Sequence, residues 1–505
     1  MQAADSPDVL FSQLMQLPTT TFETQAKTLI AASEANIARI ESQIRDLERL
    51  RDRERGVIAR LRMAIAPVNK LPAELLVEIF SLVCCWNWSS FNYGKERVKN
   101  VHKLSQVCAY WRRIVHTTPR LFRESLVFRL QKTPDADYLA VTKQWLERSS
   151  PYSIPIHLEN WGEKWRSVDA GPLMDIMSAT AHRWHSATFR LSSLDVLRRI
   201  RTVSLPSLRT FDLSSGDNKH HELTRPLLTA PHLKTVTLRT CRTSKFLLPW
   251  AQITVLDIDD DDPLECLNAL VQCTSVTHAT IETPPWKEPP DISQRPMTTL
   301  SRLEELTIDF EYHNMRGDLT GPFFAYLSLP ALKKLKITMD MGDLWSSADF
   351  TEFQRRSPNI EHLTFVGCEL DPNDLLAVLQ NSPSLVDLDM ELCRFCLDDS
   401  IILGLQYVPT QTPILAPKLQ TLSMSYAGSS FDEDDLDAMI QSRWWTDEQL
   451  LTLPSPPPVS RWSCIYIHCS DDGPSKSFSP HILAKLELYR AQGLNVDVCG
   501  YEFEE

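Results

Sequence analysis

The sequence predicts an α/β solenoid with a parallel sheet, preceded by a helical N-terminal part. Three observations carry this prediction: a short apolar pattern that recurs beyond residue 150, a proline-free apolar stripe at helical spacing, and two further helical stripes between them. The 505 residues are 43% hydrophobic and 23% charged, which is typical of a folded globular chain. We therefore expect a flexible segment at 1–25, a helix at 26–66, a helical module at 67–123 and a solenoid at 124–505.

The first helix is predicted from apolar residues at steps of three and four, close to a heptad repeat. The stripe consists of Ile30, Ile37, Ile40, Ile44, Leu47, Ile58, Leu61 and Ile65. Arg51 and Glu54 interrupt it, and Pro67 ends the helix because its ring and its missing N–H cannot continue the hydrogen-bond ladder. Two interpretations stay open: an amphipathic helix packed on the next domain, or a self-associating coiled coil.

Two short apolar helices are predicted in the module. Pro72 begins the first, where its missing N–H costs nothing. Its apolar face consists of Leu75, Leu76, Ile79, Phe80 and Val83. The second helical run, at 101–122, carries the stripe Leu104, Val107, Cys108, Trp111, Ile114 and Val115. A module of about 55 residues with one stripe per helix is too small to be stable alone, which predicts a docking partner or a packed neighbour.

These two runs, LPAELLVEIF and LSQVCAYWRRIVHTTPRLF, resemble an F-box in the form common among fungal F-box proteins. The Leu-Pro, Ile-Phe, Val-Cys and Trp-Arg pairs match in order and spacing, although the stretch between the two runs is longer than in a minimal F-box. The resemblance implies docking onto a Skp-family adaptor of a cullin–RING ubiquitin ligase. The contact residues it implies are Leu71, Pro72, Leu75, Ile79, Leu104, Val107, Cys108 and Trp111. We expect Leu76, Phe80 and Ile114 to form the core of the module instead.

Beyond residue 150 an apolar residue is followed by others three and five positions later, as in Leu208-Phe211-Leu213. Eleven such triplets begin at Trp184, Leu208, Leu233, Ile253, Val276, Leu303, Leu332, Ile360, Leu385, Leu419 and Trp462. Ser153-Ile156-Leu158 is a candidate edge copy, and the spacing becomes irregular beyond residue 430. Most spacings lie within or near the 20–29 residues of a leucine-rich repeat. The pattern therefore resembles an irregular leucine-rich-repeat solenoid, whose stacked units share one core.

The motifs that resemble catalytic or metal sites are better explained by the repeat. Cys393 and Cys396 resemble half of a zinc or redox site. However, Cys241, Cys368 and Cys393 each stand eight residues after an anchor, where leucine-rich repeats place buried Asn or Cys. We find no P-loop, dinucleotide fingerprint or nucleophile elbow in the sequence. We expect no enzyme activity, no cofactor and no metal.

The phase of the repeat also predicts a surface. Alternate residues of a strand point to opposite faces, so positions four and six after each anchor face the concave side of the solenoid. Position six carries Asp259, Glu282 and Asp309 on three successive repeats, and Asp257 stands at position four of the first. Two interpretations remain: an acidic face that only keeps the protein soluble, or a substrate-binding site for a basic segment.

The net charge of −13 is unevenly distributed. Residues 125–505 carry 34 Lys and Arg against 52 Asp and Glu, and such an acidic body repels phosphate backbones. We therefore expect no nucleic-acid partner. The chain has no apolar run near the roughly 18 residues of a membrane span and no evident secretory signal, so we expect no membrane partner. The twelve cysteines are then free thiols in a reducing compartment, either cytoplasm or nucleus.

These observations and the two resemblances lead to one expectation. The chain is expected to be a non-catalytic substrate adaptor of a Skp/cullin/F-box ubiquitin ligase. Its F-box would dock a Skp-family adaptor and through it cullin, and its array would hold an unidentified protein substrate, which the acidic face suggests is basic. Such a subunit acts through effective concentration and orientation. The alternative is a repeat-built protein-interaction scaffold with no ubiquitin-ligase role, in which the helical module serves as an N-terminal cap.

Overall fold

The computed structural model shows two compact units, Met1–Val83 and Cys84–Glu505. It describes residues 12, 15, 19–85, 93–123, 126–130, 133–160, 168–194, 197, 204–215, 229–286, 297–310, 321–339, 345–393, 396–410, 413–425, 431–450, 457–469 and 478–500. The rest of the predicted flexible segment, at 1–11, 13–14 and 16–18, lies outside the described residues.

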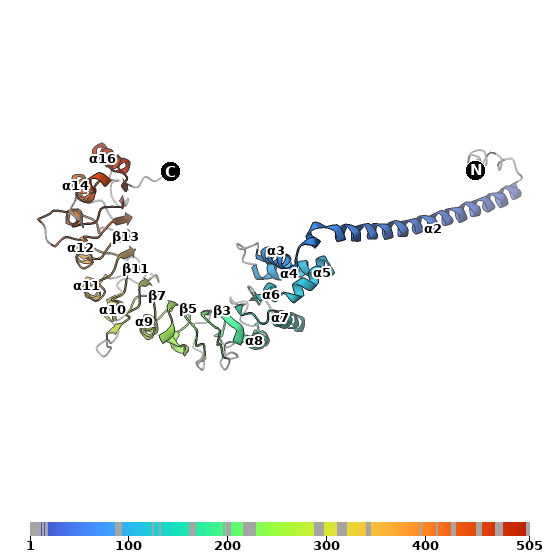
Figure 1. Cartoon of the computed structure of the whole chain (residues 1–505), viewed down its shortest axis with the longest axis horizontal. Helices are drawn as coiled ribbons and strands as arrows, with labels where there is room; N and C mark the ends of the chain where they lie inside the picture. Colours follow the sequence, from blue (N-terminus) through green and yellow to red (C-terminus); the bar gives the residue numbers. More distant parts are fainter. Residues whose placement is uncertain are drawn as a thin grey trace. The chain divides into compact units, whose positions relative to one another are not determined.

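The first unit is dominated by helix α2, Thr19–Ile65, which runs for 47 residues (Figure 1). The helix begins seven residues before the expected start at 26, so the predicted flexible segment already ends in helix. As expected, it stops just before Pro67. A 3-10 turn, η1 (Pro67–Lys70), follows, and helix α3 begins at Ala73, directly after Pro72, and ends at Cys85.

The apolar stripe of α2 is exposed along its length. Exposed fractions of its large apolar side chains range from 37% at Val57 to 70% at Ile65. Within this unit the stripe is open to a partner. Both interpretations, packing on the next domain and self-association, stay predictions.

The expected helical run at 101–122 consists of three helices, namely α4 (Tyr93–Val107), α5 (Ala109–Thr117) and α6 (Arg120–Arg123). The first break is at Cys108, whose backbone is extended and whose Sγ accepts a hydrogen bond from the backbone N–H of Trp111 at 3.4 Å. The second break is at Thr118, because the residue before a proline disfavours the helical conformation. α4 also begins eight residues earlier than the predicted run.

The second unit contains a 14-stranded parallel sheet whose strands follow one another in chain order. The strands are β1 (Leu126–Arg129), β2 (Ile154–Asn160), β3 (Trp184–Leu191), β4 (Thr210–Ser215), β5 (Thr235–Arg239), β6 (Val255–Asp259), β7 (His278–Glu282), β9 (Glu305–Asp309), β11 (Lys334–Thr338), β12 (His362–Val366), β13 (Asp387–Glu391), β14 (Thr421–Ser425), β15 (Cys464–Cys469) and β16 (Asn495–Gly500). A separate two-stranded sheet pairs β8 (Thr298–Thr299) with β10 (Leu327–Ser328).

Helices and 3-10 turns connect the strands. They are α7 (Ala136–Arg148), α8 (Gly171–Ser178), η3 (Ala181–Arg183), η5 (Thr243–Lys245), η6 (Trp250–Gln252), α9 (Pro263–Gln272), α10 (Gly321–Ala325), α11 (Ser347–Arg356), α12 (Pro372–Gln380), α13 (Asp399–Leu405), α14 (Glu433–Arg443), α15 (Asp447–Leu450) and α16 (Pro480–Ala491). Figure 1 shows the sheet along the inner side of this curved unit, with α9, α11 and α12 on the outer side. The arrangement is that of an α/β solenoid.

The eleven predicted triplets are confirmed as strands or strand entries. In every triplet the anchor and the residues three and five positions later are at most 3% exposed. The register keeps the triplets in phase: Leu256 faces Ala279, which faces Leu306, which faces Leu335. The stacked triplets therefore form one continuous core between the sheet and the helices.

Three strands at the two ends of the sheet, β1, β2 and β16, differ from the expectation. The candidate edge copy forms β2, but β1 pairs beyond it, so β2 is not the edge. The irregularly spaced last triplet forms β15, and β16 pairs on its far side. β16 is not predicted because Gly493 stands at the anchor position three residues before Val496, so only the second and third residues of the triplet, Val496 and Val498, are apolar.

Candidate binding surfaces

Helix α3 carries an apolar face that is exposed. Leu75, Ile79 and Leu82 are 52%, 39% and 65% exposed, and their spacing of four and three residues places them on one side of the helix. Leu76 and Phe80, by contrast, are fully buried, as expected for core residues. A helix with one buried and one exposed apolar face is typical of a docking surface, because soluble proteins rarely expose contiguous apolar residues without a partner.

The loop that leads into α3 supplies the two remaining residues of this candidate surface. Leu71 follows η1, is half-buried, and donates its backbone N–H to the carbonyl oxygen of Val68 at 3.3 Å. Pro72 is exposed at the start of the helix. The structure therefore brings Leu71, Pro72, Leu75 and Ile79 together at one end of the first unit.

Four of the predicted contact residues lie in the second unit. Val107, the last residue of α4, is 57% exposed and fits a contact role, and Trp111 is half-buried. Leu104 is only 7% exposed, which corrects its assignment as a contact residue: it is a core residue, as Ile114 is. Cys108 is half-buried and serves as the cap of α5. A helical stripe in a sequence does not distinguish its core side from its solvent side, and this explains the error at Leu104.

The four predicted carboxylates lie on one face of the sheet. The register places Asp259 of β6 beside Glu282 of β7, and Glu282 beside Asp309 of β9. Asp257 lies on the same face two residues before Asp259, because alternate residues share a face. We refer to Asp257, Asp259, Glu282 and Asp309 as the acidic face.

Arg239 of β5 adjoins the acidic face and was not predicted. Its Nη2 lies 2.8 Å from Oδ2 of Asp257, its Nη1 lies 3.8 Å from Oε2 of Glu282, and it is the register neighbour of Asp259. Arg239 stands six positions after the anchor Leu233, at the position that carries Asp259, Glu282 and Asp309 in the next three repeats. The repeat pattern was therefore sufficient to place it on this face. One guanidinium beside four carboxylates leaves this face with an excess of negative charge.

Burial and, to a smaller extent, neighbouring charges shift the pKa values of two carboxyl groups of the acidic face. Burial raises the pKa values of Asp259 and Glu282 above their ordinary values. The carboxylate of Asp257 raises both further, and that of Asp309 also raises the pKa of Glu282, whereas Arg239 lowers both. A cationic ligand would relieve this repulsion between the carboxylates.

The cysteines of the CxxC motif are buried in the repeat core. Sγ of Cys393 donates to the carbonyl oxygen of Phe365 at 3.6 Å, and Sγ of Cys368 donates to that of Ile337 at 3.7 Å. Sγ of Cys396 donates to the carbonyl oxygen of Cys393 at 3.0 Å, and burial raises the pKa of the Cys396 thiol. These contacts stabilise the thiol form, whereas metal ligands are thiolates. Within the described ranges, no group of three or more His, Cys, Asp or Glu side chains could hold a metal ion.

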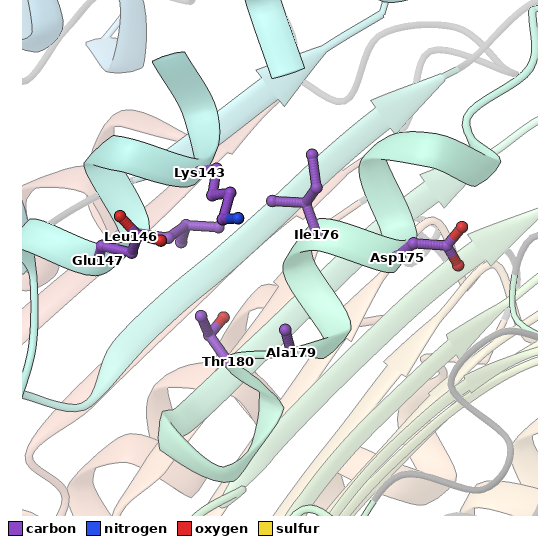
Figure 2. A pocket seen from close by; sticks show the side chains of 7 residues that line it. All are labelled: Lys143, Leu146, Glu147, Asp175, Ile176, Ala179 and Thr180. Carbon is purple, nitrogen blue, oxygen red and sulfur yellow. The ribbon is translucent and has the colours of Figure 1, made fainter. Parts of the chain in front are cut away.

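Among the described residues of the second unit, two of the pockets lie beside helices, and neither of these two is lined by a predicted site residue. The first, of about 320 Å³, lies between α7 and α8 and is lined by Lys143, Leu146, Glu147, Asp175, Ile176, Ala179 and Thr180. Figure 2 shows Lys143 extending toward Ile176, whereas the carboxylate of Asp175 points away. The second, of about 470 Å³, is lined by residues of η5, η6 and α9, including Trp250 and Glu265. The polar groups of the first pocket do not converge, as they would at a catalytic site.

Asp260, directly after β6, is a buried carboxyl group. It is 4% exposed, its Oδ1 accepts the backbone N–H of Asp262 at 3.1 Å, and its Oδ2 has no hydrogen-bond partner among the described atoms. Burial raises its pKa to about 7, and the carboxylate of Glu265 contributes to the rise.

The raised pKa of Asp260 predicts a pH-dependent stability. The folded-state pKa of Asp260 lies above the unfolded value, so the neutral carboxyl group stabilises the folded state relative to the ionised one. This contribution to the free energy of unfolding is complete below about pH 4 and is lost as the pH rises through about 7. Asp260→Asn should therefore reduce the fall in melting temperature between pH 5 and pH 8. Asp261→Asn at the exposed neighbouring position is the control. An unchanged fall in the Asp260→Asn variant would contradict this prediction.

Comparison with known proteins does not identify the chain: no protein-family model matches it, and no curated protein is significantly similar. In the parts of the chain described above, none of the helices combines the length and apolar character that crossing a membrane requires.

Proposed function

We propose that the chain is a non-catalytic substrate-recognition subunit of a Skp/cullin/F-box-type ubiquitin ligase. The observation that carries the proposal is the exposed apolar face of α3. Leu75 and Ile79 on this face are positions of the F-box-like motif, and they are exposed while their neighbours Leu76 and Phe80 are buried. The motif therefore coincides with a surface that needs a partner.

The energetics of this face favour a stable partner. Full burial of one Leu or Ile side chain contributes about 1.5–3 kcal/mol, and Leu75, Ile79, Leu82 and Val83 are all at least 39% exposed. An apolar helix face that docks into a hydrophobic groove is a common mode of recognition. Co-purification of the full chain with a Skp-family adaptor tests the proposal. A chain that never binds such an adaptor would instead fit the alternative of an interaction scaffold.

We also infer that the second unit is an irregular leucine-rich-repeat solenoid that holds a protein substrate. The support is the apolar triplet, which is buried in every one of the eleven predicted repeats. The acidic face lies on the opposite side of the same strands, where its side chains are not needed for the core. We propose that this face binds a Lys- or Arg-rich segment of the substrate.

Neutralising the acidic face should weaken the capture of a basic peptide. The variant Asp257→Asn, Asp259→Asn, Glu282→Gln and Asp309→Asn removes four negative charges that lie on adjacent strands. We expect a fluorescent oligolysine peptide to lose roughly tenfold or more in affinity, and the loss to shrink at high salt because exposed charges are screened.

The matched control removes four exposed charges that lie on helices outside the sheet: Glu147→Gln, Glu352→Gln, Glu448→Gln and Glu487→Gln. It changes the net charge equally. Equal losses of peptide affinity in the two variants would mean that the acidic face only keeps the protein soluble.

A further inference from the structure

Helix α2 presents an exposed heptad seam whose interruptions are one basic and one acidic residue. We propose that two copies of this chain associate through antiparallel α2 helices, with Arg51 of each copy paired to the partner's Glu54. This proposal does not depend on the proposed adaptor function, because α2 lies outside the F-box-like motif.

The heptad assignment follows from the helix itself. The seam alternates steps of three and four residues from Ile37 to Ile65, so Arg51 occupies an a position and Glu54 occupies the following d position. The apolar seam residues on both sides are strongly exposed, for example Leu47 at 65% and Leu61 at 61%. The charged residues are therefore part of one exposed surface that is otherwise apolar.

In an antiparallel pair the a positions of one helix face the d positions of the other. Arg51 at an a position can therefore pair with the partner's Glu54 at a d position, so neither charge faces an apolar residue. When Arg51 faces the partner's Glu54, the same register fixes every other layer of the seam. The apolar layers it creates are Ile40 with the partner's Ile65, Ile44 with the partner's Leu61, and Leu47 with the partner's Ile58. Each layer occurs twice by symmetry, so the two helices overlap from residue 40 to residue 65.

The residues that flank the seam are complementary in the same register. At the e positions, Glu48 lies near the partner's Arg55 and Glu41 lies near the partner's Arg62. Opposite charges thus line one flank. On the other flank, Leu50 lies near the partner's Val57, and both are exposed in the single chain, at 51% and 37%. Charge and hydrophobic patterns therefore select one register together.

Other arrangements of the two helices bring like charges together or place a charge against an apolar residue. A parallel, in-register pair stacks Arg51 on the partner's Arg51 and Glu54 on the partner's Glu54, and like charges at an interface are strongly unfavourable. An antiparallel pair shifted by one heptad places Arg51 against the partner's Leu47 and Glu54 against the partner's Ile44. Each charge is then buried without a counter-charge, which is strongly destabilising.

The ion pair that Arg51 makes with Asp52 in its own chain does not prevent Arg51 from pairing with the partner's Glu54. Its Nε lies 3.0 Å from Oδ1 of Asp52, and both side chains are more than half exposed. Exposed ion pairs between neighbours contribute little free energy. Gly56 falls at an f position, on the outer side of the helix, so it does not enter the interface.

Charge reversal tests the pairing in the full chain by sedimentation velocity. Arg51→Glu and Glu54→Arg should each weaken dimerisation by roughly 10- to 100-fold, the range expected for contacting charged residues. The double variant should recover an affinity close to that of the wild type. Arg49→Glu makes the same charge change at an f position and should have little effect.

A second pair of variants tests the register. Ile44→Ser should weaken the dimer because it removes an apolar layer, whereas Ile30→Ser, at an equivalent a position beyond the overlap, should not. A wild-type chain that stays monomeric at all concentrations would overturn the proposal. A dimer that Arg51→Glu does not weaken, or that both serine variants weaken equally, would overturn it as well.

Discussion

Replacing Leu75 and Ile79 by aspartate will abolish co-purification of the chain with a Skp-family adaptor. Leu75 and Ile79 are 52% and 39% exposed, whereas the core positions Leu76 and Phe80 are unchanged in this variant. In the complex, each change would remove an apolar contact worth about 1.5–3 kcal/mol and place an unpaired carboxylate in the interface. We therefore expect the dissociation constant to rise by roughly 1,000-fold or more.

The control for this result is a pair of exposed leucines on another helix. Leu483 and Leu488 of α16 are 44% and 56% exposed, and their replacement by aspartate makes the same chemical change far along the chain. This control should bind the adaptor as the wild type does. If the Leu75 and Ile79 variant also retains the adaptor, the assignment of the α3 face as the docking surface is wrong.

Arg443→Ala will strongly destabilise the C-terminal end of the sheet. The Arg443 guanidinium is fully buried, donates to the carbonyl oxygens of Ala416 at 2.9 Å and Leu415 at 2.7 Å, and lies 5.4 Å from the ring centroid of Trp462. Ala416 has a φ of 37°, in the left-handed region that favours glycine. Arg443 therefore holds a strained turn against the core, and burial lowers its pKa to about 10, which leaves it charged at neutral pH.

Removing this side chain takes the guanidinium donor away from both carbonyl oxygens and creates a cavity; Ala416 then keeps only the backbone N–H of Leu419, at 3.2 Å. We expect a loss of about 3–5 kcal/mol, in the range for large core truncations. Arg443→Lys, which keeps the charge and one possible donor contact, should lose less, and the exposed Arg355→Ala should lose almost nothing. Hydrogen exchange should show the loss at β14 to β16 first, because repeat arrays unfold locally. A melting temperature equal to that of the wild type would contradict this role.

The strands of the solenoid could be predicted because each repeat carries its own apolar triplet, which shows which residues of the strand point into the core. The triplet of Leu332, Leu335 and Ile337 contains three buried positions within six residues, and the same pattern recurs often enough to fix the register. β1 and β16 keep the second and third apolar positions but lack the apolar anchor, since Arg123 and Gly493 stand there. Their pairing depends on the open edge that the neighbouring strand offers, and this is a tertiary contribution.

The candidate sites were predictable to different degrees. The carboxylates of the acidic face follow from strand alternation alone, so their positions could be predicted. The two sides of a helical stripe could not be distinguished, which is why Leu75 and Leu104 received the same assignment although only Leu75 is exposed. The burial of Arg443 was also not predictable, because its partners Leu415 and Ala416 lie more than 25 residues away.

Gel filtration of the purified full chain mixed with a purified Skp-family adaptor tests the central claim most directly. The account predicts one complex that elutes ahead of both components and contains both proteins. The Leu75 and Ile79 variant should elute apart from the adaptor while its circular dichroism spectrum matches that of the wild type. Separate elution of the folded wild-type chain and the adaptor would contradict the account and leave a repeat-built interaction scaffold in its place.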